Sequence, residues 1–206
     1  MKFSIIIPAK DEVKRLQKTL LEFANYFNKA STEIIVVVNN SSDNTLQLAI
    51  DCASKFSNIK VLEVNKRDIP YTKGLAVKVG LEIASGKYVG YVDADNSTTP
   101  AETDRLFRIL EKSDYDSVIG NRYIAGSHVY PKQPLTRILF SRSFNTAVKL
   151  LFGLHSTDTQ CGAKFFKANV AKHIASNLLT YGWIFDVDVL SICKNAGFTV
   201  NETPTE

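Results

Sequence analysis

The sequence predicts an α/β fold, a single domain whose mostly parallel sheet is covered by helices on both faces. Strand-like and helix-like segments alternate through the first half of the 206 residues, and parallel neighbouring strands need connections about as long as a helix. The strand-like segments are unbroken Val- and Ile-rich runs, which are typical of strands buried on both faces. A hydrophobic content of 45% is ordinary for a domain that can bury one core of this size.

Five short runs in the first half are predicted strands because they are apolar and rich in β-branched residues. Pro8 ends the first of them. In chain order, the expected strands cover 3–7, 33–38, 59–64, 87–92 and 117–119.

The segments between these strands predict helices. Apolar residues recur at helical spacing in the first of them, cap-forming residues occupy 41–44, and Pro100 suits the first position of a helix. In chain order, the expected helices cover 12–28, the stretch from the 41–44 cap to about 55, 74–84 and 99–112.

The second half is less regular and shows no repeat, low-complexity tract or domain boundary. The polar loop at 120–134 contains Gly and Pro and is long enough to predict a functional role. An amphipathic helix is expected at 135–154, a further helix at 185–195 and a last strand at 198–201.

Composition argues against several classes of protein. The net charge of +4 is modest and no nucleic-acid-reading motif accompanies it, so nucleic acid is not an expected partner. Three scattered cysteines predict reduced thiols rather than disulfides or zinc. The apolar start is too short for a signal peptide, and no segment reaches the roughly 18 apolar residues of a membrane span. We therefore expect a chain that is soluble or lies on a membrane.

Polar residues gather where three predicted strands end, at 8–11, 39–41 and 93–95. In a parallel sheet, ligands bind beyond the carboxyl ends of the strands. If the strand geometry persists, Asp93 and Asp95 face the same side and can hold Mg²⁺ or Mn²⁺ together with substrate phosphates and waters. The alternative is that both aspartates form a turn before the next helix.

A nucleotide bound at this edge needs such a metal, because the usual phosphate-binding loops are missing. The sequence has no P-loop motif, and the turn after the first strand lacks the glycines of a dinucleotide fingerprint.

The order of seven short segments along the chain forms a recognisable pattern. The segments are 4–12, 33–45, 73–77, 91–95, 120–123, 158–162 and 183–188. In this order they resemble the motifs of family 2 glycosyltransferases of the GT-A type. Within that family they resemble the branch that adds mannose or glucose to dolichyl or other polyprenyl phosphates. The resemblance implies a Rossmann-like GT-A fold, with a nucleotide-sugar-binding half at 1–119 and an acceptor half at 120–206.

The resemblance also implies roles for residues of the first half. Asp95 is the expected direct ligand of Mg²⁺ or Mn²⁺ and a catalytic residue, and Asp93 is expected to contact ribose or a metal-bound water. The cation stabilises the charge that develops on the leaving diphosphate. The expected nucleotide-sugar-binding residues are Pro8, Ala9, Glu12, Asn39, Lys73, Asp93, Ala94 and Asp95.

In the second half, the resemblance implies that Arg122, Arg137 and Ser141 hold the acceptor phosphate, with Arg122 also counted as catalytic. Arginine suits phosphate oxygens, and a lipid phosphate is mostly ionised near neutral pH, so it needs no general base. A sugar hydroxyl acceptor would need one, and Asp186 or Asp188 is then the candidate. Both aspartates could instead be favourable charges at a helix N-terminus.

Two residues depart from the family pattern. Val38 stands where relatives usually carry an aspartate that contacts the nucleoside, which leaves the base of the donor open. Lys10 replaces a residue that is usually aromatic or polar, and its ammonium either meets a phosphate or is solvated.

The helix at 135–154 mixes apolar residues on one stripe with basic residues. This pattern fits a helix resting on an anionic membrane, and equally a core-facing stripe with solvated charges. The stripe consists of Phe140, Phe144, Val148 and Leu151, and the basic residues are Lys132, Arg137, Arg142 and Lys149. Since relatives generally continue beyond the last strand, the chain is also a candidate fragment of a longer protein.

The sequence thus predicts an inverting, metal-dependent transferase that moves a hexose from GDP-mannose or UDP-glucose to a polyprenyl phosphate. Its partners are the nucleotide sugar, the lipid and a membrane surface, at whose cytosolic face it would be peripheral. Two alternatives remain open, namely a family 2 transferase acting on a glycan hydroxyl and a non-catalytic nucleotide-sugar-binding module.

Overall fold

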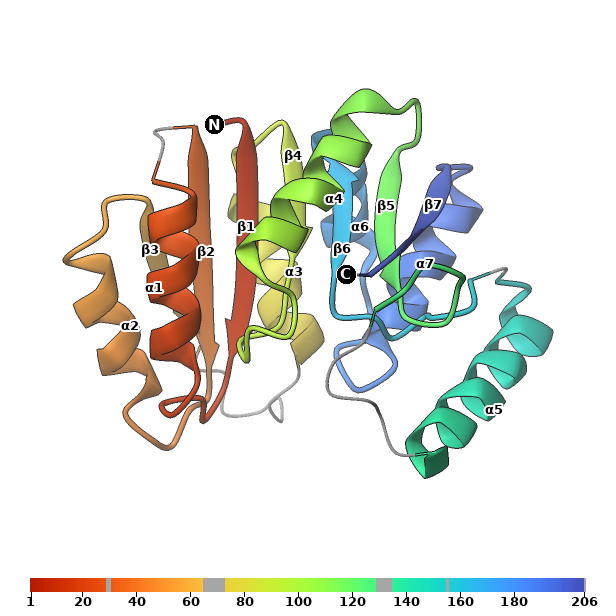
Figure 1. Cartoon of the computed structure of the whole chain (residues 1–206), viewed down its shortest axis with the longest axis horizontal. Helices are drawn as coiled ribbons and strands as arrows, with labels where there is room; N and C mark the ends of the chain where they lie inside the picture. The colour runs from red at the N-terminus through yellow and green to blue at the C-terminus, as the bar shows by residue number, and fades with distance from the viewer. Residues whose placement is uncertain (29–30, 65–72, 129–134, 155, 206) are drawn as a thin grey trace.

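A single α/β sheet organises the molecule (Figure 1). The computed structural model describes residues 1–28, 31–64, 73–128, 135–154 and 156–205, without the side chains of 135, 137 and 139. Over these residues the sheet has seven strands in the order β3-β2-β1-β4-β6-β5-β7. The strands are β1 (Phe3–Ala9), β2 (Thr32–Asn39), β3 (Ile59–Val64), β4 (Tyr88–Tyr91), β5 (Ser117–Asn121), β6 (Lys164–Lys167) and β7 (Val200–Pro204).

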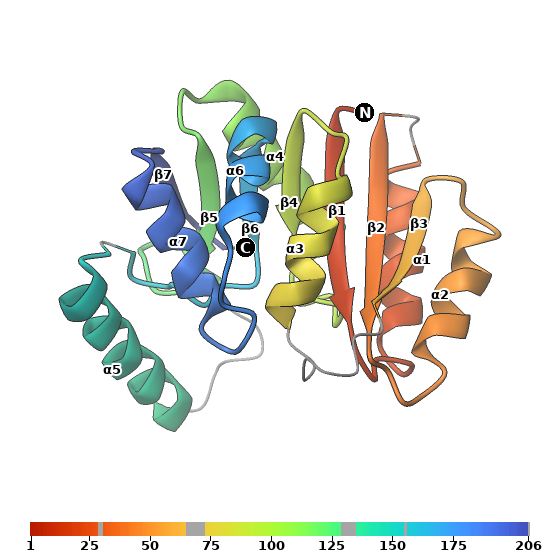
Figure 2. The same cartoon turned by 180° about the vertical axis from the view of Figure 1, so that it is seen from behind.

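Helices cover both faces of the sheet, as the sequence predicted. Helices α1, α2 and α4 pack on one face, and α3, α6 and α7 pack on the other, each layer closing its own apolar core (Figures 1 and 2). The helices of the described chain are α1 (Leu16–Tyr26), α2 (Thr45–Ala53), α3 (Lys73–Ile83), α4 (Pro100–Lys112), α5 (Leu135–Phe152), α6 (Ala168–Asn177) and α7 (Phe185–Asn195).

The strand pairing confirms a mostly parallel sheet with one exception. β6 runs antiparallel to both of its neighbours, β4 and β5. The sequence analysis missed β6 and the following α6, because β6 begins and ends with lysine and does not look like a buried run. Lys164 is nevertheless fully buried, since an acidic partner from α7 neutralises it.

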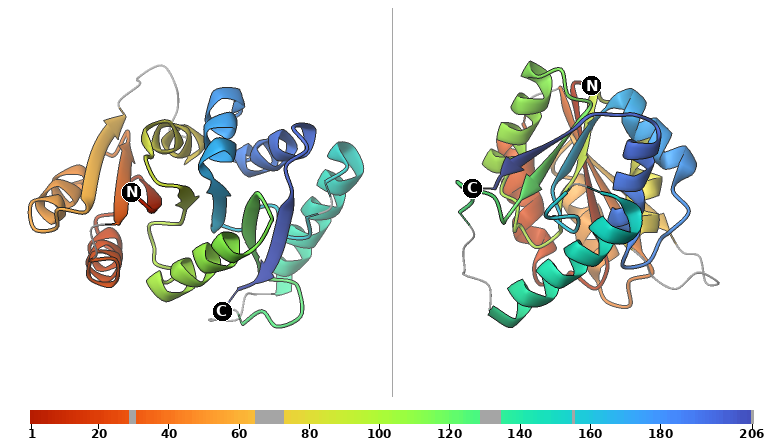
Figure 3. Two further views of the ribbon diagram at one scale, coloured as in Figure 1. Left: turned by 90° about the horizontal axis from the view of Figure 1, so that it is seen from above. Right: turned by 90° about the vertical axis from the view of Figure 1, so that its right-hand side faces the viewer.

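Helix α5 stands at one end of the molecule, beside α7 and below β5 and β7 (Figures 1 and 3). The apolar stripe of α5 is divided between the two environments that the sequence left open. Val148 is only 4% exposed and packs with Phe144 against β5 and α7, whereas Phe140 is 77% exposed and Leu151 78% exposed. Lys132 lies outside the described residues.

All three cysteines are free and buried, and burial raises the pKa of Cys161 to about 11. Among the described residues, no helix has the length and apolarity to cross a bilayer.

Candidate functional site

The loops after β1 and β2 are joined to each other by hydrogen bonds at the carboxyl edge of the sheet. Asp11 accepts the backbone N–H of Ser42 at 2.7 Å, and the backbone N–H of Glu12 donates to Thr45 Oγ1 at 2.8 Å. The hydrogen bond from the Ser42 backbone is the main reason that the pKa of Asp11 is lowered. Asp11 and Asn40 both adopt positive φ, at 52° and 50°, a conformation that non-glycine residues adopt rarely. The loops after β1 and β2 therefore form one continuous surface with a fixed conformation.

The residues predicted to bind the nucleotide sugar lie around this surface, but they differ in accessibility. Asn39 is the fully buried last residue of β2. The Glu12 carboxylate is held by the Arg15 guanidinium in two hydrogen bonds of 2.7 Å. Pro8 and Ala9 form the buried end of β1, so they can offer mainly backbone to a ligand.

The acidic couplet does not keep the strand geometry that would place both side chains on one face. β4 ends at Tyr91, and a turn begins at Ala94, which itself is buried. The Asp93 carboxylate pairs with the Lys73 ammonium at 2.5 Å. Asp95 is exposed and accepts one hydrogen bond, from the backbone N–H of Ser97 at 3.0 Å. The two carboxylates therefore have different environments.

These environments fit a divalent cation that takes some of its ligands from the substrate. Within the described part of the chain, no group of three or more His, Cys, Asp or Glu is arranged to hold a metal on its own. Mg²⁺ and Mn²⁺ need only one or two carboxylates when phosphates and waters complete their coordination. The exposed Asp95 matches the predicted direct ligand, and Asp93 is already neutralised by Lys73.

A glycine adjoins the couplet from the acceptor half. A Cβ at Gly162 would collide with the Asp93 carboxylate. The segment around Gly162 can approach Asp93 this closely only because it has no side chain there.

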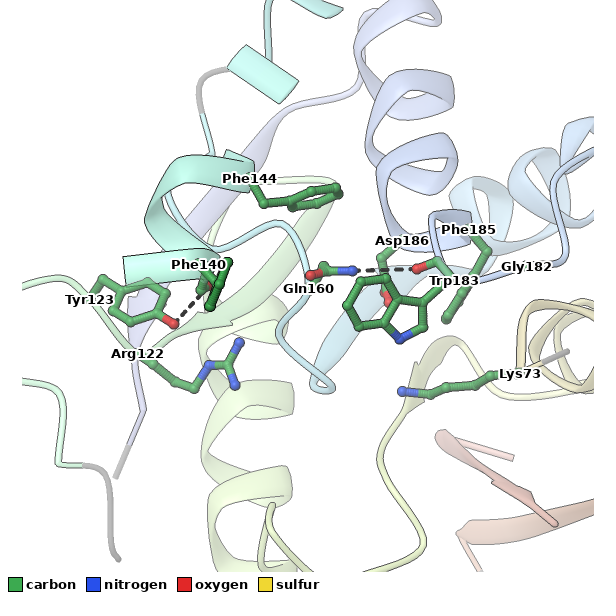
Figure 4. A pocket seen from close by; sticks show the side chains of 11 residues that line it. Lys73, Arg122, Tyr123, Phe140, Phe144, Gln160, Gly182, Trp183, Phe185 and Asp186 are labelled. Carbon is green, nitrogen blue, oxygen red and sulfur yellow. Dashed lines mark hydrogen bonds between the residues drawn. The ribbon is translucent and has the colours of Figure 1, made fainter. Parts of the chain in front are cut away.

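A pocket of about 790 Å³ is lined by Lys73, the partner of Asp93, and extends to residues of α5 (Figure 4). Lys73 lies at one side and Arg122 at the other, with Asp186 between them. The pocket is lined by Lys73, Arg122, Tyr123, Phe140, Ser141, Phe144, Gln160, Gly182, Trp183, Phe185 and Asp186.

Arg122 is oriented by a buried carboxylate. Its Nε and one Nη donate to the two oxygens of Asp158, each at 2.8 Å, and its backbone N–H donates to the same group. These hydrogen bonds raise the pKa of Arg122 above its usual value, so it carries a permanent charge. A guanidinium has five N–H donors, and Asp158 leaves some of them for a ligand in the pocket.

Two other predicted acceptor-phosphate residues belong to α5. Ser141 lines the pocket and accepts a hydrogen bond from the Tyr123 hydroxyl at 2.9 Å. Arg137 lies in the same helix, but its side chain is outside the described residues. Its role stays a prediction.

The two candidate bases on α7 have different surroundings. Asp186 is buried at the pocket wall and accepts hydrogen bonds from Lys164 at 2.5 Å and from the Tyr91 hydroxyl at 2.6 Å. Burial raises the pKa of Tyr91 well above its usual value, so the phenol stays protonated and donates. Asp188 instead accepts the backbone N–H groups of Leu179 and Thr180, and it anchors the loop that precedes α7.

Several residues of this site were not among the sequence-based candidates. Most of them lie inside the segments that carry the family resemblance, so a signal was present. Lys164 lies two residues beyond the nearest of those segments. The additional residues are Tyr91, Tyr123, Asp158, Gln160, Lys164 and Trp183.

Comparison with known proteins gives consistent findings. The family model described as Glycosyl transferase family 2 matches residues 4–175. A dolichyl-phosphate beta-glucosyltransferase from Dictyostelium discoideum is 32% identical over 212 residues, covering 97% of this chain and 64% of that protein. The Saccharomyces cerevisiae dolichyl-phosphate beta-glucosyltransferase is 28% identical over 218 residues, covering 98% of this chain and 65% of that protein. The chain thus spans just under two thirds of these relatives.

Solved structures share the fold. Glucosyl-3-phosphoglycerate synthase from Mycobacterium tuberculosis, solved with Mn²⁺, UDP and phosphoglyceric acid, superposes with a TM-score of 0.69 at 17% identity. The match covers 98% of this chain and 67% of that one. A mycobacterial protein superposes with a TM-score of 0.74 at 19% identity over 98% of this chain and 65% of its own. The GT-A fold expected from the sequence is confirmed.

Proposed function

Because the chain belongs to glycosyl transferase family 2, we propose that it transfers glucose from UDP-glucose to the phosphate of a polyprenyl lipid. Relatives named as dolichyl-phosphate beta-glucosyltransferases align with 97% and 98% of the chain, which supports this donor and acceptor class. The UDP bound in the M. tuberculosis synthase supports the same nucleotide. GDP-mannose has no such support among these proteins.

The observation that carries the proposal is the arrangement of charge along the pocket. Lys73, next to Asp93, lies at the donor side, and Arg122 with Ser141 lies at the other side (Figure 4). A diphosphate at one side and a lipid phosphate at the other would place the glucose between them. Both anions then meet a cation, which offsets the cost of bringing them together.

The reaction is a single displacement. An oxygen of the lipid phosphate attacks the anomeric carbon, the bond to the diphosphate breaks, and UDP leaves with both bonding electrons. The sugar passes through an oxocarbenium-like state, as in glycoside hydrolysis, and its anomeric configuration inverts. No proton has to be removed from the nucleophile, because a phosphate monoester with a second pKa near 6 is largely ionised.

Asp95, with Asp93 beside it, would hold a divalent cation on the diphosphate. When bound, the cation supplies Lewis-acid stabilisation of the leaving group's charge. Arg122 orients the acceptor phosphate, because Asp158 fixes the plane of its guanidinium.

Exposed apolar side chains near the pocket provide a surface for the lipid and for the cytosolic face of its membrane. Trp183 is 83% exposed, Leu179 81% and Phe140 77%. Trp183 and Phe140 both line the pocket, and Trp is common at membrane interfaces. This surface supports a peripheral location.

A transfer assay with the purified chain tests the proposal. It would be supplied with radiolabelled UDP-glucose or GDP-mannose, dolichyl phosphate and Mn²⁺, and labelled lipid would be measured after organic extraction. We expect lipid labelling from UDP-glucose that EDTA abolishes and that Arg122→Ala reduces at least a hundredfold.

Other outcomes identify the alternatives. Labelling of an added glycan that is lost in Asp186→Asn but not in Arg122→Ala would support a hydroxyl acceptor with Asp186 as base. Metal-dependent binding of UDP-glucose without any transfer would support a binding module.

A further inference from the structure

Within the part of the chain that the structure describes, hydrogen-bond donors reach only one of the two oxygens of Asp186. Lys164 and Tyr91 both donate to Oδ1, at 2.5 and 2.6 Å. They come from paired positions of the neighbouring strands β6 and β4, whereas Asp186 is in the first turn of α7. Three elements therefore converge on one carboxylate oxygen.

Burying this charged pair costs free energy. Lys164 has no exposed side-chain surface and Asp186 has only 7%, and removing two charges from water costs several kcal/mol each. Pairing offsets part of that cost, and Lys164 also donates to the Cys161 carbonyl at 2.7 Å. A well-packed apolar pair would stabilise the fold at least as well. The charged pair lies instead at the wall of the pocket.

The position of Asp186 in the pocket indicates what it faces. Of the described residues that line the pocket, it is the only acidic one, and it lies between Lys73 and Arg122 (Figure 4). If the two cations take the diphosphate and the acceptor phosphate, the group between them is the hexose. Hexose hydroxyls are hydrogen-bond donors, and an ionised carboxylate only accepts.

We propose that Asp186 accepts a hydrogen bond from one hydroxyl of the donor's hexose, and that Lys164 and Tyr91 are positioning residues that hold it for this contact. The proposal deepens the proposed function, on which it rests for the identity of the donor. It assigns Asp186 to donor-sugar recognition rather than to proton removal.

Substituting Asp186 with asparagine reverses the polarity of this contact. Lys164 and Tyr91 both donate, so they select the amide oxygen of asparagine as their partner. The amide NH₂ group then faces the pocket and offers a donor where the carboxylate offered an acceptor. The size of the side chain and both supporting hydrogen bonds are retained.

The test is a binding cycle with the purified chain and Mn²⁺. Calorimetry would measure Kd for UDP-glucose and for its 2-, 3-, 4- and 6-deoxy analogues, with wild type and Asp186→Asn. We expect one deoxy analogue to bind wild type about tenfold more weakly than UDP-glucose, as for a hydrogen bond to a charged group. The same analogue should bind Asp186→Asn as well as UDP-glucose does.

A second variant tests the positioning role without removing a charge. Tyr91→Phe should reduce the discrimination against that same analogue about threefold, with binding of UDP itself unchanged. Tyr88→Phe, in the same strand, is the matched control and should leave the discrimination as in wild type.

The inference is overturned if no deoxy analogue loses affinity in wild type, or if the loss is the same in folded Asp186→Asn. The proposed function can fail separately. A chain that shows the coupling between Asp186 and one hydroxyl, but transfers nothing to dolichyl phosphate, would support the sugar contact and refute the acceptor.

Discussion

Two buried carboxylates, Glu33 and Asp186, have opposite hydrogen-bonding patterns. Glu33 accepts on both oxygens, with Ser4 and Ser85 on Oε1 and Lys60 on Oε2. Among the described residues, hydrogen-bond donors reach only Oδ1 of Asp186, whose side chain lines the pocket. A carboxylate whose two oxygens both accept hydrogen bonds from the protein stabilises the fold. A carboxylate beside a cavity that accepts on one oxygen can use the other for a ligand.

The two groups also lie at opposite edges of the sheet. Glu33 is near the amino end of β2, and its partners precede or begin the neighbouring strands. Asp186 lies at the carboxyl end of β4, where it accepts a hydrogen bond from Tyr91, the last residue of that strand. In α/β folds, ligands bind beyond the carboxyl ends of the strands. The amino ends, where Glu33 lies, are then left to contacts that stabilise the fold.

The largest expected effect is on stability at the structural edge. Glu33→Leu leaves the buried Ser4 hydroxyl without its acceptor, and likewise the hydroxyl and backbone N–H of Ser85. It also leaves Lys60 without its carboxylate, so it should lower the free energy of unfolding by about 4 kcal/mol. Urea denaturation measures this effect, and activity per folded molecule should be unchanged. Glu63→Leu, at an exposed position of β3, is the control. Equal losses in both variants would contradict the comparison.

Low pH should remove the contribution of Glu33 to the free energy of unfolding. Burial acts to raise the pKa of Glu33, but hydrogen bonds from Lys60, Ser4 and Ser85 outweigh it and lower the pKa from 4.5 to about 2. A lowered folded-state pKa means that the contribution is complete above the unfolded value and is lost as the pH falls through the folded value. We expect Glu33 to account for a loss of roughly 3 kcal/mol between pH 5 and pH 2. Denaturation of wild type and Glu33→Gln across this range measures it, and parallel pH profiles would refute it.

At the binding edge, a carboxylate should affect activity rather than stability. Asp95→Asn should lower kcat/KM about a hundredfold, which corresponds to about 2.7 kcal/mol, and leave the urea midpoint unchanged because Asp95 is exposed. Steady-state transfer assays with Mn²⁺ check this. Asp114→Asn, an exposed position at the opposite edge, should change neither quantity. A large loss of stability in Asp95→Asn would make Asp95 structural.

A smaller effect is expected where the two halves of the site touch. In Gly162→Ala the new methyl group displaces the Asp93 carboxylate. We expect a rise of about tenfold in KM for UDP-glucose, or about 1.4 kcal/mol, with kcat less affected. An unchanged KM would show that the position of Asp93 is irrelevant to donor binding.

The smallest effect concerns the exposed partner of Glu33. The Lys60 side chain is 53% exposed, and ion pairs with exposed members contribute little. Lys60→Met should therefore cost only about 0.5 kcal/mol by urea denaturation. A cost as large as that of Glu33→Leu would mean that the ion pair, rather than the hydroxyl and backbone donors, stabilises this edge.

Elements with local signals were predicted well. β3 and α7 have the expected bounds, and α4 begins within one residue of the expected position. Thr99 caps α4 by accepting the Glu102 N–H at 3.2 Å, with Pro100 next to it as anticipated. Caps and apolar periodicity depend on neighbours in the chain, so the sequence displays them directly.

Elements that depend on distant partners were not predicted. The sequence pattern of β6 does not predict a buried strand because the strand begins and ends with lysine. The burial of Lys164 requires a carboxylate 22 residues away. The strand geometry on which a shared face for Asp93 and Asp95 depended does not persist, and the alternative of a turn applies. A turn replaces the strand after Tyr91, and Lys73 orients Asp93.

The sequence by itself determined the family and the GT-A layering, since these follow from periodicity, caps and the order of motifs. It also predicts the carboxyl edge of the sheet as the place for a ligand. Only the tertiary structure decided which charges neutralise each other and which donors Asp186 meets at the pocket wall. Those outcomes depend on distances between residues far apart in the chain, where burial makes each unpaired charge costly.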